Sequence, residues 1–407
     1  MTKTLPRYSA NPSNHEFYQN PYPIYQKMHA LGPCFFWEEY GYVCFPGYQE
    51  VNAILRDRRF GREVTHVMDR KEAGLPDIPD HLKSFYDFEA NSMLEREPPV
   101  HTRLRRLVNR AFVSRHIERL TPDLEALCDE LIAEFPKNKP FDLLPAYCEK
   151  IPVLVIADLL GVPRTMADQL LDWSHKMVAM YQFNRSREIE NAAVKATAEF
   201  DAYIRHLAEL RRSSPKDDLL TGLVEAQSAG DSLSMDELVT TAILLLNAGH
   251  EATVHAIGNS LKTLLENEID TAALFAEKKS QDGAIEELLR FDPPLHLFTR
   301  FVLEDLEFAG VQLKKGQTIG LLLGAANHDE ARYANAHQLD FTRGGEGHTS
   351  FGAGIHFCLG APLARLEMAI ALPAIFKKCP ELKLAEKPVY SDRYHFHGLE
   401  KLMISVR

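Results

Sequence analysis

Residues 351–360 read FGAGIHFCLG, and APLARLE follows at residues 361–367. Three glycines within nine residues let the backbone turn tightly and approach a flat ligand. Pro362 and the apolar pattern after it predict a helix that begins just past Cys358, because proline is favoured in the first turn of a helix. The positive end of that helix and nearby backbone N–H groups favour the thiolate form of Cys358, which is the form that ligates a metal. The stretch therefore predicts a metal-binding thiolate at the start of a helix.

Composition and charge limit the class of protein. The chain has 407 residues, with 46 Lys and Arg against 57 Asp and Glu, so its formal net charge is −11. This acidic balance argues against a nucleic-acid binder, and 45% apolar with 25% charged residues is ordinary globular usage. The start of the chain has no charged segment followed by an apolar one, and the longest apolar runs are far shorter than the roughly 20 residues of a membrane span. We expect a soluble cytoplasmic protein without a signal peptide or membrane contact.

Cysteine usage agrees with a reducing compartment. The six cysteines are widely scattered and include no C-x-x-C pair, which argues against a disulfide framework and against a zinc ribbon.

The pattern along the chain is mainly helical with short β runs. Helical patterning is expected at 21–31 and, with interruptions at 136–140 and 213–216, from 100 to 286. A β-hairpin is expected at 34–37 and 41–45, and β-rich runs are expected at 301–308 and 318–323. No repeat or flexible linker marks a boundary, so the sequence predicts a single domain over residues 1–407, mainly α with small β-sheets.

The longest predicted helix begins at the capping box Ser234-Met-Asp-Glu237 and continues to about Glu266. Its length of roughly 45 Å is enough to cross a domain, so we expect it to be buried. The middle of the helix, at 247–253, reads NAGHEAT. A glycine and a charged residue in a buried helix cost stability unless something must approach closely, so we expect the site to lie against this segment.

A zinc-protease motif is excluded on the same helix. The histidines of HEATVH, His250 and His255, are five positions apart rather than four. At about 100° per residue their imidazoles lie roughly 140° apart around the helix and cannot share one ion.

The 351–360 stretch resembles the haem-ligand signature of the cytochrome P-450 family, F-G-x-G-x-H-x-C-x-G, at every defined position. The resemblance extends over nearly the whole chain, in the form of the soluble bacterial members. It implies one domain that encloses haem b between the long central helix and the Cys-bearing loop, with Cys358 as the axial thiolate ligand of the iron. The other residues that the resemblance places against the haem are Ala248, Gly249, Phe351, Gly352 and Gly360.

Further motifs of the family are present in its order. His101 and Arg105 match its H-x-x-x-R segment, and Arg300 and His356 occupy further positions that bind the haem propionates. The i, i+4 spacing puts His101 and Arg105 on one helical face.

A second set of matching residues has an implied structural role. Glu287 and Arg290 match the E-x-x-R helix of the family, and their i, i+3 spacing also puts them on one face. Arg343 occupies the position of the third charge that buttresses this pair.

The sequence departs from the family at the proton-delivery motif, A-G-x-D/E-T. Glu251 keeps the acid, but Ala252 stands at the alcohol position, and Thr253 lies about 100° further round the helix. One explanation is a helix bulge at Ala248-Gly249 that brings Thr253 to the site. The other, which we favour, is that a substrate hydroxyl or an ordered water replaces the missing group.

The substrate pocket is carried over by position only. Its expected residues are bulky and apolar, which indicates a mostly apolar substrate of small to medium size: Phe183, Leu244, Leu295, Phe298 and Phe396. His296 and His395 are candidates to hold a polar end of the substrate. Terpenoids, aromatic acids, fatty acyl chains and macrolide-like compounds all remain open.

The resemblance implies a monooxygenase that inserts one atom of O₂ into an organic substrate. No flavin fingerprint or cluster-binding cysteine set is present, so electrons are expected from a separate ferredoxin and its NAD(P)H-dependent ferredoxin reductase. Arg103, Arg106 and Arg110 are candidates to steer that acidic donor, with a merely solvated basic face as the alternative. We expect a monomer.

Two other functions share the haem motif. A peroxide-driven peroxygenase is disfavoured, because such family members typically carry an Arg-Pro pair where this chain has Glu251-Ala252. A non-catalytic haem-binding or sensing protein would explain the altered alcohol position, but the retained Glu251 argues against it.

Overall fold

The computed structural model describes the chain except residues 1–4, 112–116, 118, 182–184, 229–232, 344, 346 and 407, and except the side chains of residues 110 and 111. Contacts divide the chain into two compact units, each made of segments that are separated in sequence. The first unit contains Met1–Gly74, Glu125–Cys148 and Ala252–Arg407, and the second contains Leu75–Leu124 and Glu149–Glu251.

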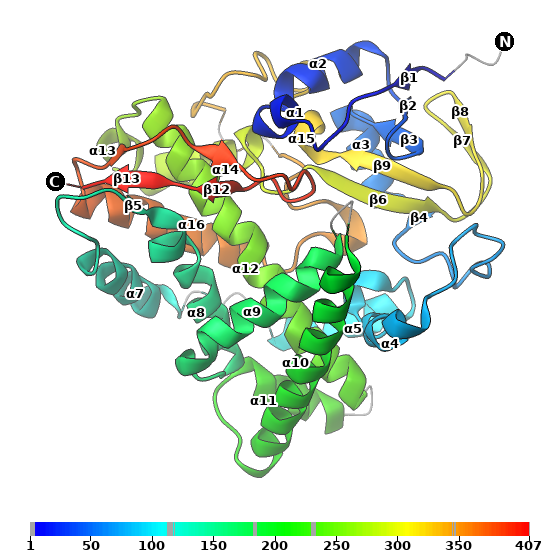
Figure 1. The fold of residues 1–407 in the computed structure, drawn as a ribbon, viewed down its shortest axis with the longest axis horizontal. Coiled ribbons are helices and arrows are strands. Elements are labelled where there is room, and N and C mark those ends of the chain that lie inside the picture. Colours follow the sequence, from blue (N-terminus) through cyan, green and yellow to red (C-terminus); the bar gives the residue numbers. More distant parts are fainter. Residues whose placement is uncertain are drawn as a thin grey trace. The chain divides into compact units, whose positions relative to one another are not determined.

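A six-stranded sheet organises the first unit and joins strands from residues 7–61 with strands from residues 297–322 (Figure 1). Its strand order is β1-β2-β3-β9-β6-β4, with bounds Arg7–Tyr8, Phe35–Trp37, Tyr42–Phe45, Thr318–Leu322, Leu297–Val302 and Phe60–Gly61. The predicted hairpin is confirmed, since β2 pairs antiparallel with β3, and the predicted strand near residue 318 is β9, which runs parallel to β3. The inward side chains of this sheet form an apolar core with helix α3 (Tyr48–Arg56).

The β run expected at 301–308 is wrong in its bounds. The structure ends β6 at Val302 and begins a separate strand, β7 (Leu306–Phe308), which pairs with β8 (Val311–Leu313). Asp305 explains the break, because its carboxylate accepts hydrogen bonds from the Lys315 backbone N–H at 2.9 Å and from Lys314 Nζ at 2.8 Å. A polar side chain that is bonded across the loop turns the chain away from the ladder.

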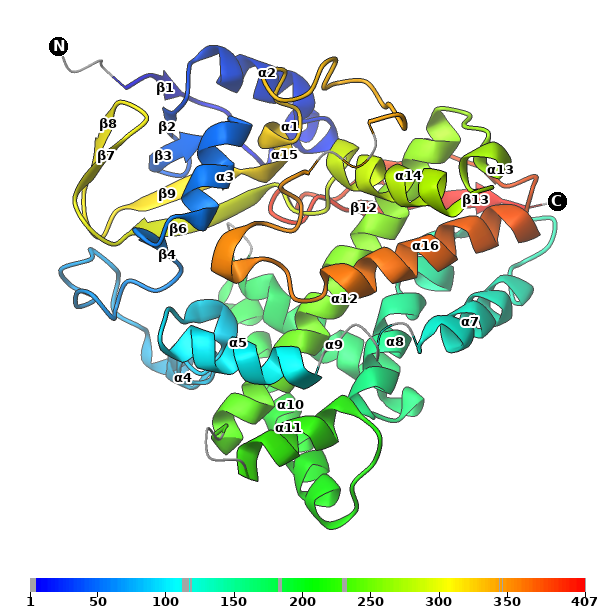
Figure 2. The same cartoon turned by 180° about the vertical axis from the view of Figure 1, so that it is seen from behind.

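The remaining elements of the first unit are helices and small sheets. The helices are α1 (His15–Gln19), α2 (Tyr22–Ala30), α13 (Thr271–Leu274), α14 (Lys278–Phe291), α15 (Leu323–Ala326) and α16 (Ala361–Lys378), and α7 (Thr121–Ala133) lies mostly in this unit. The small sheets are β10-β13-β5 (Lys383–Leu384, Met403–Ser405, Phe141–Asp142) and β11-β12 (Val389–Tyr390, Leu399–Lys401). Figure 2 shows α16 alongside α14, which places the helix after Cys358 against the helix of the E-x-x-R motif.

The second unit is helical throughout its named elements. They are α4 (Lys83–Glu89), α5 (Val100–Ala111), α8 (Lys150–Leu160), α9 (Ala167–Val178), α10 (Arg187–Ser213) and α11 (Leu219–Ser228). Helices α9 and α10 pack along each other. None of the helices within the described residues is both long enough and apolar enough to cross a bilayer.

Helix α12 (Met235–Glu266) is the predicted long helix and carries residues of both units. Its predicted capping box is confirmed: Ser234 Oγ accepts from the Glu237 backbone N–H at 3.0 Å, and Glu237 Oε2 accepts from the Ser234 backbone N–H at 2.9 Å. The helix is one continuous α-helix over all 32 residues. The first explanation for the displaced Thr253 required a bulge at Ala248-Gly249, and the helix has no π-bulge there.

Candidate functional site

The Cys358 loop is held by two glycines in the left-handed region. Gly352 has φ +65° and Gly354 has φ +69°, which L side chains rarely adopt. A Cβ added at Gly354 would lie 2.1 Å from the carbonyl oxygen of Leu55, at the end of α3. The backbone N–H of Cys358 donates to the carbonyl of Phe351 at 2.9 Å, which closes the loop. The glycines therefore let the loop double back against α3 and set the position of the cysteine.

Cys358 stands just before the N-terminus of α16. The predicted helix start is confirmed, since α16 begins at Ala361 with Gly360 as its N-cap and Pro362 in its first turn. Cys358 and Cys379 are half-buried, whereas the other four cysteines are buried, and no two of the six form a disulfide. A half-buried sulfur at the positive end of a helix is in the environment that favours a thiolate ligand.

Arg365 braces the loop and was not predicted. Its guanidinium lies 4.5 Å from the centre of the Phe351 ring, and its Nη2 donates to Glu286 Oε2 at 2.9 Å. His348 Nε2 lies 3.3 Å from the same carboxylate oxygen. Burial raises the pKa of Glu286, but the hydrogen bonds with Arg365 and His348 outweigh it and lower this pKa to about 2. The carboxylate is thus charged at neutral pH and anchors the first residue of the loop to α14.

The structure brings together the three charges of the predicted structural set. Arg290 Nε donates to Glu287 Oε2 at 2.7 Å, and Arg343 Nε donates to Glu287 Oε1 at 3.3 Å. Arg290 also donates to the carbonyls of Asn327 and Ala336. This buried network fastens the segment that leads from α15 toward the Cys358 loop.

The four expected propionate partners occupy the two units. In the first unit, Arg300 is buried on β6 and donates to the Thr299 carbonyl at 2.8 Å, and His356 is half-buried at the end of a short 3₁₀ helix, Gly354–His356. In the second unit, His101 is buried and Arg105 is half-buried, one turn apart on α5. Their binding of propionates stays a prediction.

An apolar stripe of α12 is open although the helix is otherwise mostly buried. Leu244 and Ala252 are half-buried and Ala248 between them is exposed, whereas Leu245 and Leu246 are buried. Positions i, i+4 and i+8 lie on one side of a helix. Because the side chains of this stripe are apolar and only partly buried, the stripe can pack against the face of a flat apolar group such as haem.

Gly249 has a packing reason that the sequence did not reveal. A Cβ added there would lie 3.3 Å from Cγ1 of Ile156 on α8, which is tighter than most real contacts. The glycine therefore lets α12 approach α8 closely, and its predicted haem contact stays a prediction.

Glu251 has a partner that sequence reasoning missed. The buried Glu251 Oε1 lies 3.4 Å from Nε2 of His175, whose side chain on α9 is 48% exposed. Nothing in the local sequence of α9 marks this histidine, because the contact joins positions 76 residues apart (251 − 175 = 76). The contact connects a buried carboxylate with an imidazole that reaches solvent.

Two of the expected pocket residues meet through the backbone. Leu295 and Phe396 form an antiparallel bridge, which the hydrogen bond from the His397 N–H to the Pro294 carbonyl at 2.9 Å extends. Leu295, Phe396 and Phe298 are each half-buried. Phe183 lies outside the described residues.

The expectation for His296 is wrong. Its Nδ1 lies 2.6 Å from the hydroxyl of Tyr25 and its Nε2 lies 3.1 Å from the carbonyl of Pro293, and the ring is fully buried. Burial lowers the pKa of His296 well below its ordinary value, so the ring is neutral. Both nitrogens serve the protein core, which leaves His395 as the candidate for a polar end of the substrate.

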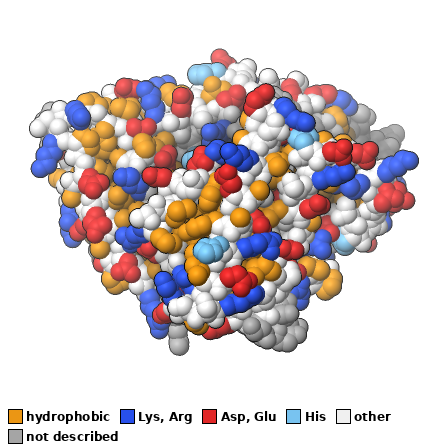
Figure 3. Space-filling view, turned by 60° about the horizontal axis from the view of Figure 1, so that its bottom comes forward, with side chains coloured by type: hydrophobic (Ala, Val, Ile, Leu, Met, Phe, Trp, Pro, Cys, Tyr) orange, Lys and Arg blue, Asp and Glu red, His pale blue; other side chains and the backbone are white. Residues whose placement is uncertain are grey.

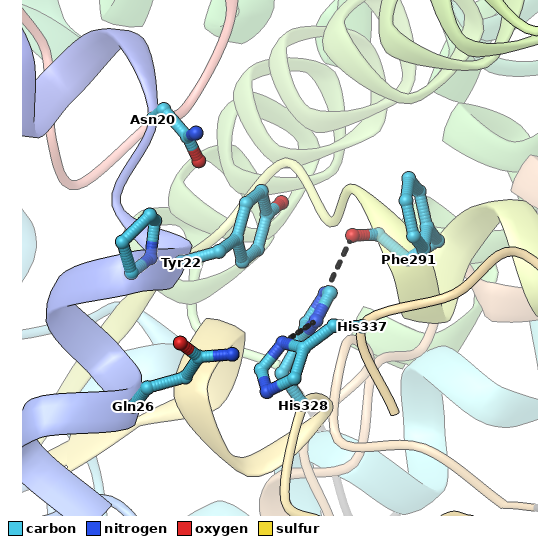
Figure 4. Close-up of a pocket in the computed structure, with 7 residues that line it drawn as sticks. Asn20, Tyr22, Gln26, Phe291, His328 and His337 are labelled. Carbon is cyan, nitrogen blue, oxygen red and sulfur yellow. Dashed lines mark hydrogen bonds between the residues drawn. The ribbon is translucent and has the colours of Figure 1, made fainter. Parts of the chain in front are cut away.

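A separate cavity of about 280 Å³ lies beside α2 (Figure 4). Its lining residues are Asn20, Tyr22, Pro23, Gln26, Phe291, His328 and His337, which differ from the residues expected for the substrate. His328 Nε2 lies 2.8 Å from the Phe291 carbonyl, and burial lowers the pKa of His328 to about 3. We assign this cavity no role in the reaction.

The basic residues that were candidates for steering a partner differ in their surroundings. Arg103 Nη1 donates to Glu237 Oε2 at 3.1 Å, so the charge of Arg103 is paired with a carboxylate at the start of α12. Arg106 is exposed, and the side chain of Arg110 lies outside the described residues. Figure 3 shows acidic and basic side chains interspersed over the face that it displays.

Comparisons with known proteins agree on one family. The family model described as Cytochrome P-450 matches residues 43–392. The polyketide biosynthesis cytochrome P-450 PksS of Bacillus subtilis (strain 168) is 34% identical over 407 residues, which cover 97% of this chain and 98% of that protein. The 6-deoxyerythronolide B hydroxylase of Saccharopolyspora erythraea is 34% identical over 365 residues and 88% of each chain. The structure of P450BioI in complex with hexadec-9Z-enoic acid ligated acyl carrier protein matches with a TM-score of 0.88 at 32% identity, over 96% of this chain and 99% of that chain.

Proposed function

Because this chain belongs to the cytochrome P-450 family, whose members are haem b monooxygenases, we propose that it oxidises a mostly apolar organic substrate of small to medium size, with one atom of O₂ entering the product. One observation carries the proposal. The half-buried Cys358 follows two left-handed glycines and stands at the N-terminus of α16. We take the whole chain, residues 1–407, as one haem domain, since the family match runs through segments of both compact units.

The residues of this chain fit the haem that the family carries. Cys358 would supply the thiolate ligand, with Phe351, Gly352 and Gly360 next to it in the same loop. The open stripe of α12 around Ala248 and the adjacent Gly249 would contact the haem, and His101, Arg105, Arg300 and His356 would bind its propionates. When bound, the haem supplies the iron at which O₂ is reduced and activated.

Glu251 is the proposed proton carrier. Its Oε1 lies next to His175 Nε2, so a proton entering from solvent at the imidazole can pass to the carboxylate. The continuous α12 supports the second explanation for the Ala252 position, in which a substrate hydroxyl or an ordered water takes the place of the threonine hydroxyl. Thr253 is buried on the next face of the helix.

Electrons are proposed to come from a separate ferredoxin with an NAD(P)H-dependent ferredoxin reductase. Among the described basic side chains of α5, Arg106 is exposed, and we favour it for steering this donor. We propose a cytoplasmic monomer that works without nucleic acid or membrane, consistent with the acidic composition and the absence of disulfides among the six cysteines.

The substrate class is proposed from the relatives together with the pocket residues. PksS is named for polyketide biosynthesis, and the second relative is named as a hydroxylase of 6-deoxyerythronolide B. The P450BioI structure is a complex with acyl carrier protein that carries hexadec-9Z-enoic acid. Leu244, Leu295, Phe298 and Phe396 are apolar and only half-buried, which suits an acyl or polyketide chain. We therefore favour fatty acyl chains and polyketides over terpenoids and aromatic acids.

The test combines ligand binding with turnover. Ferric holoprotein is titrated with free fatty acids, carrier-bound acyl chains, macrolactones, terpenoids and aromatic acids, and the haem band is followed for the shift from low to high spin. A ligand that shifts the band is then incubated with reduced ferredoxin under ¹⁸O₂, and the product is expected to contain one labelled oxygen. Faster turnover with peroxide than with ferredoxin would indicate a peroxygenase, and binding without oxygen consumption would indicate a non-catalytic protein.

The role of Glu251 has its own test. Glu251→Gln keeps the shape of the side chain and removes its titratable proton, so turnover is expected to fall by about 10²-fold or more while the haem spectrum is unchanged. Unchanged turnover in this variant would contradict proton delivery through Glu251.

A further inference from the structure

Three metal-binding side chains converge at the contact between α9 and the middle of α12. They are His175, His250 and Glu251, all within the second unit, and their ligand atoms lie within 4.8 Å of one another. His175 Nε2 lies 3.4 Å from Glu251 Oε1, and His250 Nε2 lies 3.8 Å from the same oxygen. The rings of the two histidines are 5.5 Å apart at their centres.

The donor set and its spacing suit a transition-metal dication. Two imidazole nitrogens and one carboxylate oxygen form an open three-ligand zinc set, in which water completes a tetrahedron. With metal–ligand bonds of about 2.0–2.1 Å, the ligand atoms of a tetrahedral site lie about 3.3 Å apart. The 3.4 Å contact already matches this spacing, and the 3.8 Å contact requires a movement of only a few tenths of an ångström.

The surroundings of His250 favour the ligating tautomer. Its Nδ1 lies 3.4 Å from the carbonyl of Leu246 and 3.4 Å from the hydroxyl of Ser174. A carbonyl can only accept, so the hydrogen bond to Leu246 requires the proton on Nδ1 and leaves the lone pair on Nε2. That lone pair then faces a carboxylate oxygen, and a cation between the two atoms removes their repulsion. Outer hydrogen bonds of this kind also orient the histidines of known metal sites.

Access to the site comes through α9. The His175 side chain is 48% exposed, while those of His250 and Glu251 are 1% and 7% exposed. An ion can therefore reach the first ligand from solvent and be held by the two buried ones.

We propose that His175, His250 and Glu251 form a binding site for Zn²⁺ or a similar transition-metal dication. The ion takes one nitrogen from each imidazole and the carboxylate of Glu251. Because the proposed function uses the same carboxylate to deliver protons, the bound ion inhibits turnover, and this consequence rests on the proposed function. The binding itself does not depend on it.

The binding test uses haem-loaded protein freed of other metals by a chelator and titrated with ZnCl₂ in a calorimeter. His175→Gln removes the exposed ligand, and His206→Gln, at an exposed position on α10 in the same unit, is the matched control. The tightest zinc affinity is expected to fall by at least about 10-fold in His175→Gln and to stay unchanged in His206→Gln. Equal affinities in the wild type and in both variants would overturn the proposal.

A second measurement needs no variant. X-ray absorption at the zinc edge of the wild-type protein with one equivalent of Zn²⁺ is expected to show two imidazoles and oxygen donors around the ion. Fewer than two imidazoles in that shell would overturn the site even if His175→Gln failed to fold.

Turnover separates the two proposals. Zinc at saturation is expected to slow the ferredoxin-supported reaction of the wild type, and to do so less in His175→Gln. If zinc binds through His175 but leaves turnover unchanged, the metal site stands and the proposed role of Glu251 fails. If neither calorimetry nor absorption finds the site while Glu251→Gln is inactive, the metal site fails and the role of Glu251 stands.

Discussion

Alanine at Gly354 is expected to cost far more stability than alanine at Gly352, although both glycines have nearly the same backbone conformation. With φ near +65° at each, an alanine pays about 1–2 kcal/mol for the left-handed conformation. At Gly352 the added Cβ would lie 3.5 Å from a ring carbon of Phe298, which is an ordinary contact. At Gly354 it would lie 2.1 Å from the Leu55 carbonyl oxygen and 3.1 Å from the Arg56 Cα, both of which are backbone atoms that cannot rotate away.

The clash at Gly354 adds an overpacking cost of about 1–3 kcal/mol or more. Gly352→Ala is thus expected to lower the free energy of unfolding by about 1–2 kcal/mol, and Gly354→Ala by about 2–5 kcal/mol. The assay is urea unfolding of the haem-loaded proteins, followed by circular dichroism and by the haem band. Since the loop carries Cys358, Gly354→Ala is also expected to contain less haem after purification. Equal effects of the two substitutions on stability and haem content would refute this account of the loop.

Further predictions concern buried charges and the altered proton-delivery motif. The charged Glu286 stabilises the fold above its unfolded pKa of 4.5, and this stabilisation is lost as the pH falls toward its folded pKa of about 2. Glu286→Gln is therefore expected to lower the free energy of unfolding by about 3 kcal/mol at pH 7, measured by urea unfolding. The difference between this variant and the wild type is expected to narrow below pH 4.5. Glu367→Gln on α16 is the matched control and is expected to change little, because burial raises the pKa of Glu367 well above its ordinary value and so favours the neutral carboxyl. An equal loss of stability in both variants would contradict the charged state of Glu286. Asp292→Asn is expected to cost about 3 kcal/mol in the same assay, because it removes one of the two carboxylates that pair with the mostly buried Lys262, Asp292 at 3.5 Å and Glu266 at 3.3 Å. A change below about 1 kcal/mol would contradict this. Ala252→Thr is expected to leave the ratio of product formed to NAD(P)H consumed unchanged or lower, whereas a large gain would show that a missing hydroxyl limits the enzyme.

Features with local sequence signals were predicted well. The capping box at Ser234 sets the start of α12, and Gly360 with Pro362 sets the start of α16, because caps and first-turn prolines act within a few residues. The hairpin of β2 and β3 also follows from alternation over a short stretch.

Features that depend on distant contacts could not be read from one sequence. The parallel pairing of Val43 with Ile319 joins strands that no local pattern connects. The contact of His175 with Glu251 is likewise tertiary, and the error at His296 arose because Tyr25, far away in sequence, occupies one of its nitrogens. Chemistry-bearing residues were therefore identified by type, but their partners required the structure.

The identity of the thiolate ligand is the central claim, and the ferrous–CO absorption spectrum tests it most directly. The wild type is expected to show the red-shifted haem band of a thiolate-ligated CO complex. Cys358→Ser is expected to lose this band, and Cys379→Ser, which changes the other half-buried cysteine, is expected to keep it. A wild-type protein without the band, or a Cys358→Ser variant that retains it, would contradict the account.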